Sequence, residues 1–297
     1  MRPRLDVGFG AGAGSARPRD GLDESAGSGS GSVRSVHSVF YEVDGADTFV
    51  ATQATIGPWS PDAQHGGPPS ALAARLMEAH EPAENQRLAS VTVDILRPVP
   101  PGKLTARTAT IRPGKRVALL ETVLEAGGQE VLRARGWRIA VPPHFDPDAL
   151  ADDHEAPLIP EPRPMRTSPW PGVVVDGYLS ALDWRYVAGG FDQRGPGVAW
   201  VRPLIPLLPG EEMSPMCRAL LIADSGNGLS SELDPAEYVF VNVDLKVVLH
   251  RDPADEWLLL DAATALGPVG SALAVSTLSD FAGLCGQGTQ TLLVSAR

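Results

Sequence analysis

One carboxylate in the second half of the chain follows an apolar segment and is a candidate general base. Asp224 comes directly after the run Leu220–Ala223. A carboxylate near a hydrophobic core must accept hydrogen bonds or become protonated, and a buried one can take a proton from water. The alternative is a residue that ends a helix in a local turn with Gly226 and Gly228. The residues alone leave both interpretations open.

Two neutral amides are candidates for holding a water molecule beside such a base. Asn242 lies in the strand-like run 237–250, where asparagine is unfavourable and therefore requires a reason. Gln290 lies in the last strand-like run, and its amide can both donate to a water and accept from one. Either amide could instead face solvent on its strand, and Gln287 is a nearby competitor for the role of Gln290.

A second group of candidates precedes the first predicted helix. Gly66 and Gly67 allow a ligand to approach the backbone closely, because glycine has no side chain. The N–H groups at a helix start lack intrahelical partners and can stabilise an oxyanion. His65 could be a base, but a histidine beside two glycines is more often a turn residue, which favours a structural or substrate-channel role. Gln64 stands beside it.

The composition is that of a globular protein with an acidic balance. The 297 residues include 43% hydrophobic and 21% charged residues, and the formal net charge is −11. This charge argues against nucleic acid or an anionic membrane surface as the main partner. No apolar run approaches the roughly 20 residues of a membrane span, and two cysteines cannot build a disulfide framework or a zinc site. We expect a cytoplasmic protein without a metal or cofactor.

The elements around these residues follow one order twice. In the first half, a strand-like run at 47–56 is followed by a proline-led helix that ends at Ala79. Four further strand-like runs come next, at 88–97, 103–112, 116–126 and 130–141. Short turns between the four runs predict hairpins in an antiparallel meander. In the second half, strand-like runs at 182–188 and 197–203 precede a helix from Ser214 to about Leu229. Four more strand-like runs follow, at 237–250, 256–266, 269–279 and 284–295.

The two halves also resemble each other, which favours an internal duplication. Val91–Ile95 (Val-Thr-Val-Asp-Ile) is echoed by Val241–Leu245 (Val-Asn-Val-Asp-Leu). The first-half counterpart of Asp224 then falls near Ala74 and that of Gln290 near Arg135, so only the second half carries the polar set. We expect a disordered tail, a first unit, a linker and a second unit, at 1–34, 35–141, 142–180 and 181–297 respectively.

Several short motifs resemble those of the acyl-CoA thioesterase family of the type II double hot-dog kind. They are Gly57-Pro58-Trp59, Gln64–Pro68, Val93–Pro100, Ala223-Asp224-Ser225 and the late Gln290. No one motif is highly specific, but their order and spacing are, and the resemblance covers roughly residues 37–297. It implies an α+β double hot-dog, in which two tandem antiparallel sheets each wrap a helix.

The resemblance further implies hydrolysis of an acyl-CoA to a free acid and coenzyme A, with no cofactor. Asp224 matches the family's catalytic aspartate, and Asn242 stands where the family commonly has threonine, so rate and substrate could differ. With Gln290 these residues would hold and activate the attacking water. The expected substrate-binding residues are Gln64, His65, Gly66 and Gly67.

Two other functions stay open at this point. One is a non-catalytic binder of acyl thioesters or fatty acids, which the asparagine at position 242 favours. The other is a hot-dog hydratase or dehydratase, whose chemistry usually uses an acidic residue with a histidine and which requires His65 and Asp224 to share one pocket. Because exposed sheet edges favour pairing between subunits, we also expect a homo-oligomer, with acyl-CoA as ligand and no nucleic-acid partner.

Overall fold

The structure is a computed structural model, which describes residues 38–83, 85–142, 158–160 and 174–297. The predicted tail at 1–34 and most of the predicted linker therefore lie outside the described residues. Residues Ser35–Arg297 form one compact unit. Within the described ranges, no helix has the length and apolar character needed to cross a membrane.

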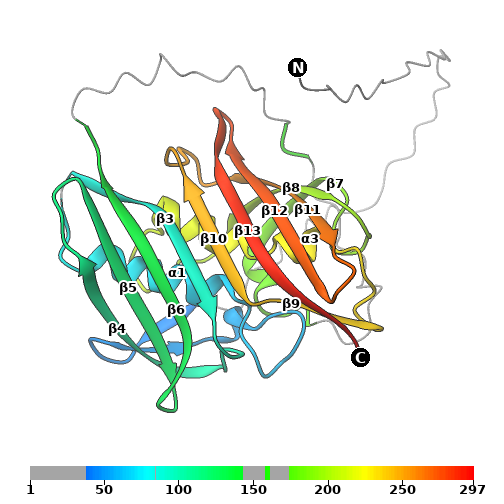
Figure 1. The fold of residues 1–297 in the computed structure, drawn as a ribbon, viewed down its shortest axis with the longest axis horizontal. Helices are drawn as coiled ribbons and strands as arrows, with labels where there is room; N and C mark the ends of the chain where they lie inside the picture. Colours follow the sequence, from blue (N-terminus) through cyan, green and yellow to red (C-terminus); the bar gives the residue numbers. More distant parts are fainter. Residues whose placement is uncertain (1–37, 84, 143–157, 161–173) are drawn as a thin grey trace, which may run out of the picture. The chain divides into compact units, whose positions relative to one another are not determined.

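One antiparallel sheet of 13 strands forms the front layer of the protein, and the helices lie behind it (Figure 1). The first half contributes β1 (Tyr41–Val43), β2 (Thr48–Ala51), β3 (Gln86–Ile95), β4 (Gly102–Arg112), β5 (Val117–Ala126) and β6 (Gln129–Ala140). The second half contributes β7 (Leu182–Ala188), β8 (Gly197–Pro203), β9 (Tyr238–Asn242), β10 (Asp244–Leu249), β11 (Leu258–Leu266), β12 (Ser271–Asp280) and β13 (Gly283–Ala296). The helical elements are η1 (Gln53–Thr55), α1 (Gly67–Ala79), η3 (Leu179–Ala181), α2 (Pro215–Ala223) and α3 (Gly226–Leu229).

The order of the strands is symmetric about the centre of the sheet. It runs β1-β2-β4-β5-β6-β3-β10-β13-β12-β11-β8-β7, and β9 pairs with the end of β13. Helix α1 packs behind the first-half strands, and α2 and α3 pack behind those of the second half (Figure 1). Each half is thus a sheet wrapped on a helix, and the α+β double hot-dog prediction is confirmed.

The predicted meander over 88–141 is wrong for its first strand. β3 does not pair with β4 but crosses over to lie between β6 and β10. The connection Pro98–Pro101 contains three prolines, which lack the N–H groups that a hairpin ladder requires. The strands β4, β5 and β6 do form the predicted hairpins.

The antiparallel pair β3–β10 joins the two halves at the centre of the sheet. Asp94 lies opposite Asp244, and Val93 lies opposite Leu245. Asp94 and Asp244 hold the same position in the two echoed segments, so each half meets its own counterpart, as in a two-fold dimer. This register supports an internal duplication of one unit.

Helices α1 and α2 run antiparallel and pack against each other under the sheet. The start of α1 lies against Leu221 in the last turn of α2, and Ser214 at the start of α2 donates to Glu78 near the end of α1. The residues of α1 that line its buried face include Ala71, Ala73 and Ala74. These small side chains allow the two helix axes to come close together.

Two elements of the second half are interrupted where single elements were predicted. The helix predicted from Ser214 to Leu229 ends at Ala223, and α3 begins only at Gly226. The strand predicted over 237–250 is divided at Val243 into β9 and β10. Both interruptions lie beside candidate catalytic residues, where the chain leaves a regular element.

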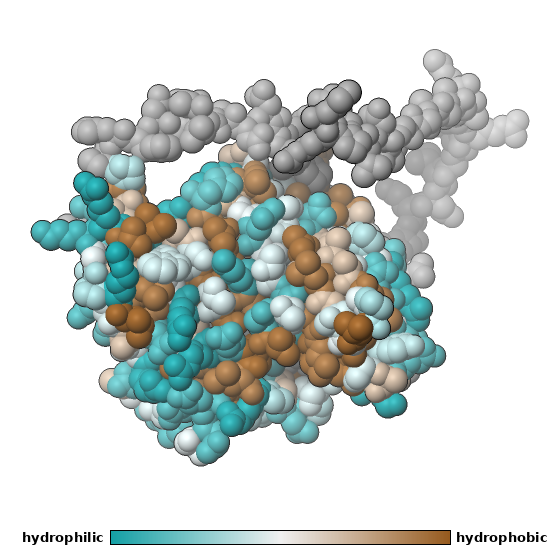
Figure 2. All heavy atoms as spheres, viewed as in Figure 1, coloured by the Kyte–Doolittle hydropathy of each residue, from teal (hydrophilic) through white to brown (hydrophobic). Residues whose placement is uncertain are grey.

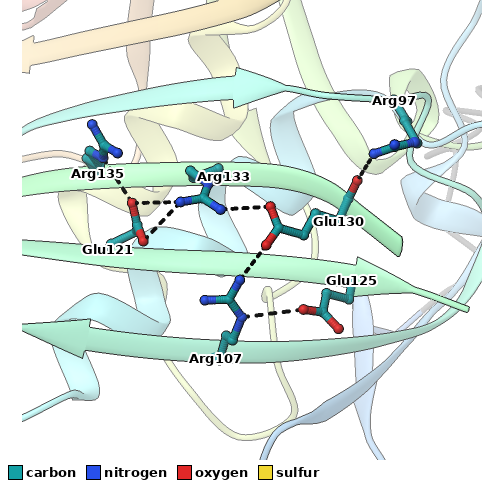
Figure 3. Close-up of polar contacts among 7 residues, drawn as sticks. All are labelled: Arg97, Arg107, Glu121, Glu125, Glu130, Arg133 and Arg135. Atoms are coloured by element: carbon teal, nitrogen blue, oxygen red, sulfur yellow. Dashed lines mark hydrogen bonds and ion pairs between the residues drawn. The ribbon is translucent and has the colours of Figure 1, made fainter. Parts of the chain in front are cut away.

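The outer face of the first-half sheet carries a network of charged side chains (Figure 3). Its members are Arg97, Arg107, Glu121, Glu125, Glu130, Arg133 and Arg135. Arg135 is exposed and donates to Glu121, and its buried neighbour Ala134 is the residue that lines up with Gln290 across β3 and β10, next to the predicted position. The two neighbours differ because a shift of one residue moves a side chain to the opposite face of a strand.

The buried, inward-facing charged residue of β6 is Arg138. Its guanidinium donates to the carbonyls of Met77, His80 and Glu81, which lie at and beyond the end of α1. These carbonyls have no intrahelical partner, so a cation placed there is favourable. Arg138 therefore closes the end of the first-half helix.

A buried ion pair fixes the β12–β13 turn of the second half. Asp280 is fully buried and accepts hydrogen bonds from the guanidinium of Arg251 and from the N–H groups of Ala254 and Ala282. Burial by itself raises the pKa of Asp280, but these hydrogen bonds and the charge of Arg251 outweigh it and lower the pKa to about 2.

We expect this pair to make the protein sensitive to acid. Because the ordinary pKa of Asp280 is 3.8 and the folded value is about 2, its contribution is complete above pH 3.8 and is lost as the pH falls through 2. The difference corresponds to about 2 kcal/mol of unfolding free energy. Urea unfolding of wild type and Asp280→Asn between pH 2 and pH 7 measures it, and an identical pH dependence of the two proteins would contradict the assignment.

Candidate active site

Asp224 ends α2, and its side chain enters the seam between the two halves. The residue is 2% exposed, and its backbone N–H caps the helix by bonding to carbonyls of the last turn. A Cβ added to Gly66 would lie 2.8 Å from Oδ2 of Asp224. The carboxylate thus rests against the start of α1, where the helix dipole favours negative charge. Asp224 is a helix cap through its backbone, while its side chain is available for a different role.

Both predicted amides contact Asp224, although they come from different strands. Nδ2 of Asn242, at the end of β9, donates to Oδ1 of Asp224 across 2.8 Å. Nε2 of Gln290, in β13, donates to the backbone carbonyl of Asp224 across 3.0 Å and lies 3.4 Å from Oδ1. Oε1 of Gln290 accepts from the N–H of Asn227 across 3.0 Å. Gln290 therefore fixes the break between α2 and α3, and Asn242 fixes one oxygen of the carboxylate.

His65 comes from the first half and completes the group. Its Nδ1 lies 3.0 Å from Oδ2 of Asp224, and the N–H of Gly67 points to the same nitrogen across 3.2 Å. The nitrogen–oxygen contact requires a proton between the two atoms. With the proton on Nδ1, the imidazole donates to Asp224 and the N–H of Gly67 is left for another acceptor. One buried hydrogen bond thus links the two halves at the candidate base.

The start of α1 offers few backbone donors, and they lie beside the carboxylate. Pro68 and Pro69 occupy the first turn and have no N–H. The N–H groups of Gly66 and Gly67 remain there, and a Cβ at Gly67 would stand less than 3.0 Å from the carbonyl oxygen of Leu221. Only glycine allows this approach of the two helices. Gly66 and Gly67 therefore lie at a helix start beside the candidate base.

Gln64 has a different position from its three neighbours. Its Oε1 accepts from the hydroxyl of Tyr41 across 2.6 Å, and its Nε2 donates to the carbonyl of Pro100 across 2.7 Å. Its backbone forms a bridge with Ile56. The amide is thus engaged in holding the loop that presents His65, and Gln64 does not contact Asp224 in the described hydrogen bonds.

Tyr178 belongs to the site but was not predicted, because it falls in the proline-rich stretch 142–180 that is predicted as a linker. Its ring stacks on the imidazole of His65, with 3.7 Å between centroids and 5° between planes. Its hydroxyl contacts Leu221 and Ser225, on either side of Asp224 in the chain. The only signal was an aromatic residue, followed by Leu179, within a proline-rich stretch.

The opposite end of the helix pair holds a second buried carboxylate, on Glu78. Its oxygens accept from the hydroxyl of Ser214 and the thiol of Cys217 at the start of α2, beside a cavity of about 230 Å³. Burial raises the pKa of Glu78. The expectation that only the second-half helix carries a carboxylate is therefore wrong, although the residues around Glu78 differ from those around Asp224.

A double hot-dog that joins a carboxylate, an imidazole and helix-start amides between its halves has the groups of a hydrolase. The sequence comparisons agree with this class. A model of the acyl-CoA thioesterase N-terminal domain matches residues 55–139, and a model of the acyl-CoA thioesterase C-terminal domain matches residues 152–294. The chain belongs to the acyl-CoA thioesterase family and is a thioester hydrolase. No curated protein matches it in sequence.

Solved structures show the same fold at low sequence identity. A putative thioesterase from Novosphingobium aromaticivorans is 20% identical, with a TM-score of 0.63 over 86% of this chain and 98% of that one. A putative thioesterase II from Thermobifida fusca is 18% identical, with a TM-score of 0.62 over 86% and 95%. The acyl-CoA thioesterase II TesB2 of Mycobacterium marinum is 17% identical, with a TM-score of 0.59 over 86% and 95%.

Proposed function

We propose that the protein hydrolyses acyl-CoA with a water molecule activated by Asp224. The observation that carries this proposal is the buried carboxylate, held at Oδ1 by Asn242 and at Oδ2 by His65 and resting on the start of α1. A base fixed in this way needs no rearrangement when the water arrives. Asn242 is half-buried and donates to the base, which supports a role for its amide in holding the water.

The reaction balances with the groups present. Asp224 takes one proton from water while the water oxygen forms a bond to the thioester carbonyl carbon. The carbonyl oxygen becomes an oxyanion, for which the N–H groups of Gly66 and Gly67 are the donors at the helix start. Collapse of this intermediate breaks the carbon–sulfur bond, and the coenzyme A thiolate receives the proton. The products are a free carboxylic acid and coenzyme A.

In this mechanism, His65 orients the base. Its Nδ1 lies 3.0 Å from Oδ2 of Asp224 and donates a hydrogen bond to that oxygen, while Asp224 takes the proton from water. A hydrogen bond to a carboxylate is stronger in a buried site than in water. Gln290 supports the reaction from behind, because its amide fixes the backbone of Asp224.

Release of free thiol from a panel of acyl-CoA substrates, from short to long chains, tests the function. We expect release with at least one chain length, with the matching carboxylic acid identified by mass spectrometry. Complete inertness towards every member would instead favour the non-catalytic binder of acyl thioesters. Extraction of bound ligand and mass spectrometry would then identify its cargo.

Hydration of an unsaturated acyl thioester is a second candidate, favoured by one observation. The two halves do bring His65 and Asp224 into one buried contact, which this chemistry requires. Water would add across the double bond, with its oxygen on C3 and a proton on C2. Loss of the conjugated thioester absorbance without release of thiol would identify this reaction, whereas release of thiol from the same substrate supports hydrolysis.

We also propose a cytoplasmic homo-oligomer. The outer face of the sheet displays apolar side chains among polar ones (Figure 2), and the exposed ones include Trp137, Ile139, Val248, Leu273 and Val275. Such a face and the edge strands β1 and β7 favour association between subunits. A molar mass of about 31 kDa by light scattering at working concentration would contradict the oligomer.

A further inference from the structure

We propose that Tyr178 is a positioning residue that fixes His65 against Asp224; this inference rests on the hydrolysis proposed above. Tyr178 lies just before η3, outside the sheet. Its ring covers one face of the imidazole of His65 in a parallel stack, 3.7 Å between centroids. The stack prevents the imidazole from tilting out of the plane in which Nδ1 points to Oδ2 of Asp224.

The backbone fixes the distance between the two rings. The N–H of His65 donates to the carbonyl of Thr55 across 2.8 Å, and the N–H of Tyr178 donates to the carbonyl of Ile56 across 2.9 Å. The backbones of His65 and Tyr178 are therefore hydrogen-bonded to two adjacent residues at the end of η1. Gly177 has a φ of +153°, and a Cβ there would lie 2.6 Å from the carbonyl oxygen of Ile56. Glycine is required for Tyr178 to reach this position.

The hydroxyl of Tyr178 extends the same constraint to the second half. It donates to the carbonyl of Leu221 across 2.6 Å and lies 2.8 Å from Oγ of Ser225. Leu221 is in the last turn of α2, and Ser225 follows Asp224. Burial raises the pKa of Tyr178 far above its ordinary value, so the hydroxyl stays protonated and remains a donor.

One side chain thus contacts His65 directly and holds the residues that flank Asp224. Its ring holds His65 of the first half, and its hydroxyl holds the chain on both sides of Asp224 in the second half. A tyrosine with only a packing role would stabilise the fold without setting the distance between Nδ1 and Oδ2. A positioning role and a packing role of Tyr178 therefore predict different effects of its substitution on the contact between His65 and Asp224.

Three variants separate the roles. Tyr178→Phe keeps the stacked ring and removes the hydroxyl, whereas Tyr178→Leu removes the stack. Tyr186→Leu is the matched control, because Tyr186 is a buried tyrosine of the neighbouring strand β7. We expect Tyr178→Leu to lower kcat about 100-fold with little change in KM. Tyr178→Phe should lose only about fivefold, as for one hydrogen bond, and Tyr186→Leu should keep its kcat.

A second readout does not depend on activity. The proton between Nδ1 of His65 and Asp224 should give a downfield proton NMR resonance, assigned by its loss in His65→Gln. We expect this resonance to persist in Tyr178→Phe and in Tyr186→Leu and to disappear in folded Tyr178→Leu. An unchanged resonance in Tyr178→Leu would overturn the positioning role, whereas an inert wild type that shows the same resonance pattern would refute only the proposed hydrolysis.

Discussion

Replacing Asp224 by asparagine is expected to lower kcat for thioester hydrolysis by about 1,000-fold, within the range that general-base catalysis contributes. The amide has no basic oxygen to take the proton from water. The substitution also removes one hydrogen bond. Asn242 and His65 each donate to one carboxylate oxygen of Asp224, so in the variant one of these donors would face the N–H₂ group of the new amide. Steady-state release of thiol by purified variant and wild type measures the effect.

The matched control for this change is Asp261→Asn. Asp261 lies on β11 and is exposed, so its substitution makes the same chemical change away from the seam. We expect the control to keep wild-type kcat, and thermal unfolding of both variants shows whether the folded state is retained. A kcat of Asp224→Asn within tenfold of wild type would exclude this carboxylate as the base.

Gly67→Ala is expected to damage both stability and catalysis. The new methyl group would stand against the backbone carbonyl of Leu221 and 3.2 Å from Nδ1 of His65. Backbone cannot rotate aside as a flexible side chain can, so the start of α1 must move away from the end of α2. We expect a loss of about 2 kcal/mol of unfolding free energy, typical of overpacking. The displacement should also lower kcat about 100-fold, because it separates His65 and the helix-start amides from Asp224.

A glycine in the turn between β5 and β6 provides the control. Gly128 has a φ of +75°, and a Cβ there would meet nothing within 4 Å. Gly128→Ala therefore strains the backbone by about 1 kcal/mol without touching the seam. We expect it to lower the unfolding midpoint in urea and to leave kcat unchanged. Wild-type kcat in Gly67→Ala would show that the close contact of the two helices does not matter for catalysis.

Local patterns in the sequence predicted much of the fold and part of the site. The prolines after Gly67 mark the start of α1, and the glycine-rich and proline-rich turns mark the hairpins of β4, β5 and β6. Asp224 is conspicuous because it ends an apolar run, and Asn242 because it lies between valines in a strand, whereas Gln290 stands among Gly and Thr and carries a weaker signal. Such signals are readable because they reflect backbone preferences and burial, which depend on neighbouring residues.

Matching the two halves by sequence located the position that lines up with Gln290 to within one residue, but it did not say which side chain faces inward. In the register across β3 and β10, Ala134 lines up with Gln290, whereas its neighbour Arg135 faces out and pairs with Glu121. A strand alternates its side chains, so a shift of one residue reverses the face. The bulge between Leu124 and Glu125 of the β5–β6 pair, like the division of the strand at Val243, changes that count without a clear mark in the sequence.

The contact between His65 and Asp224 was decided by tertiary structure. The two residues belong to different halves, and they meet because β3 crosses to the centre of the sheet, pairs with β10 and brings α1 and α2 together antiparallel. Tyr178 joins them from a segment with no regular pattern. Residue types set what each side chain can do, but which distant side chains meet depends on how two packed units share one sheet, and that pairing is a property of the whole chain.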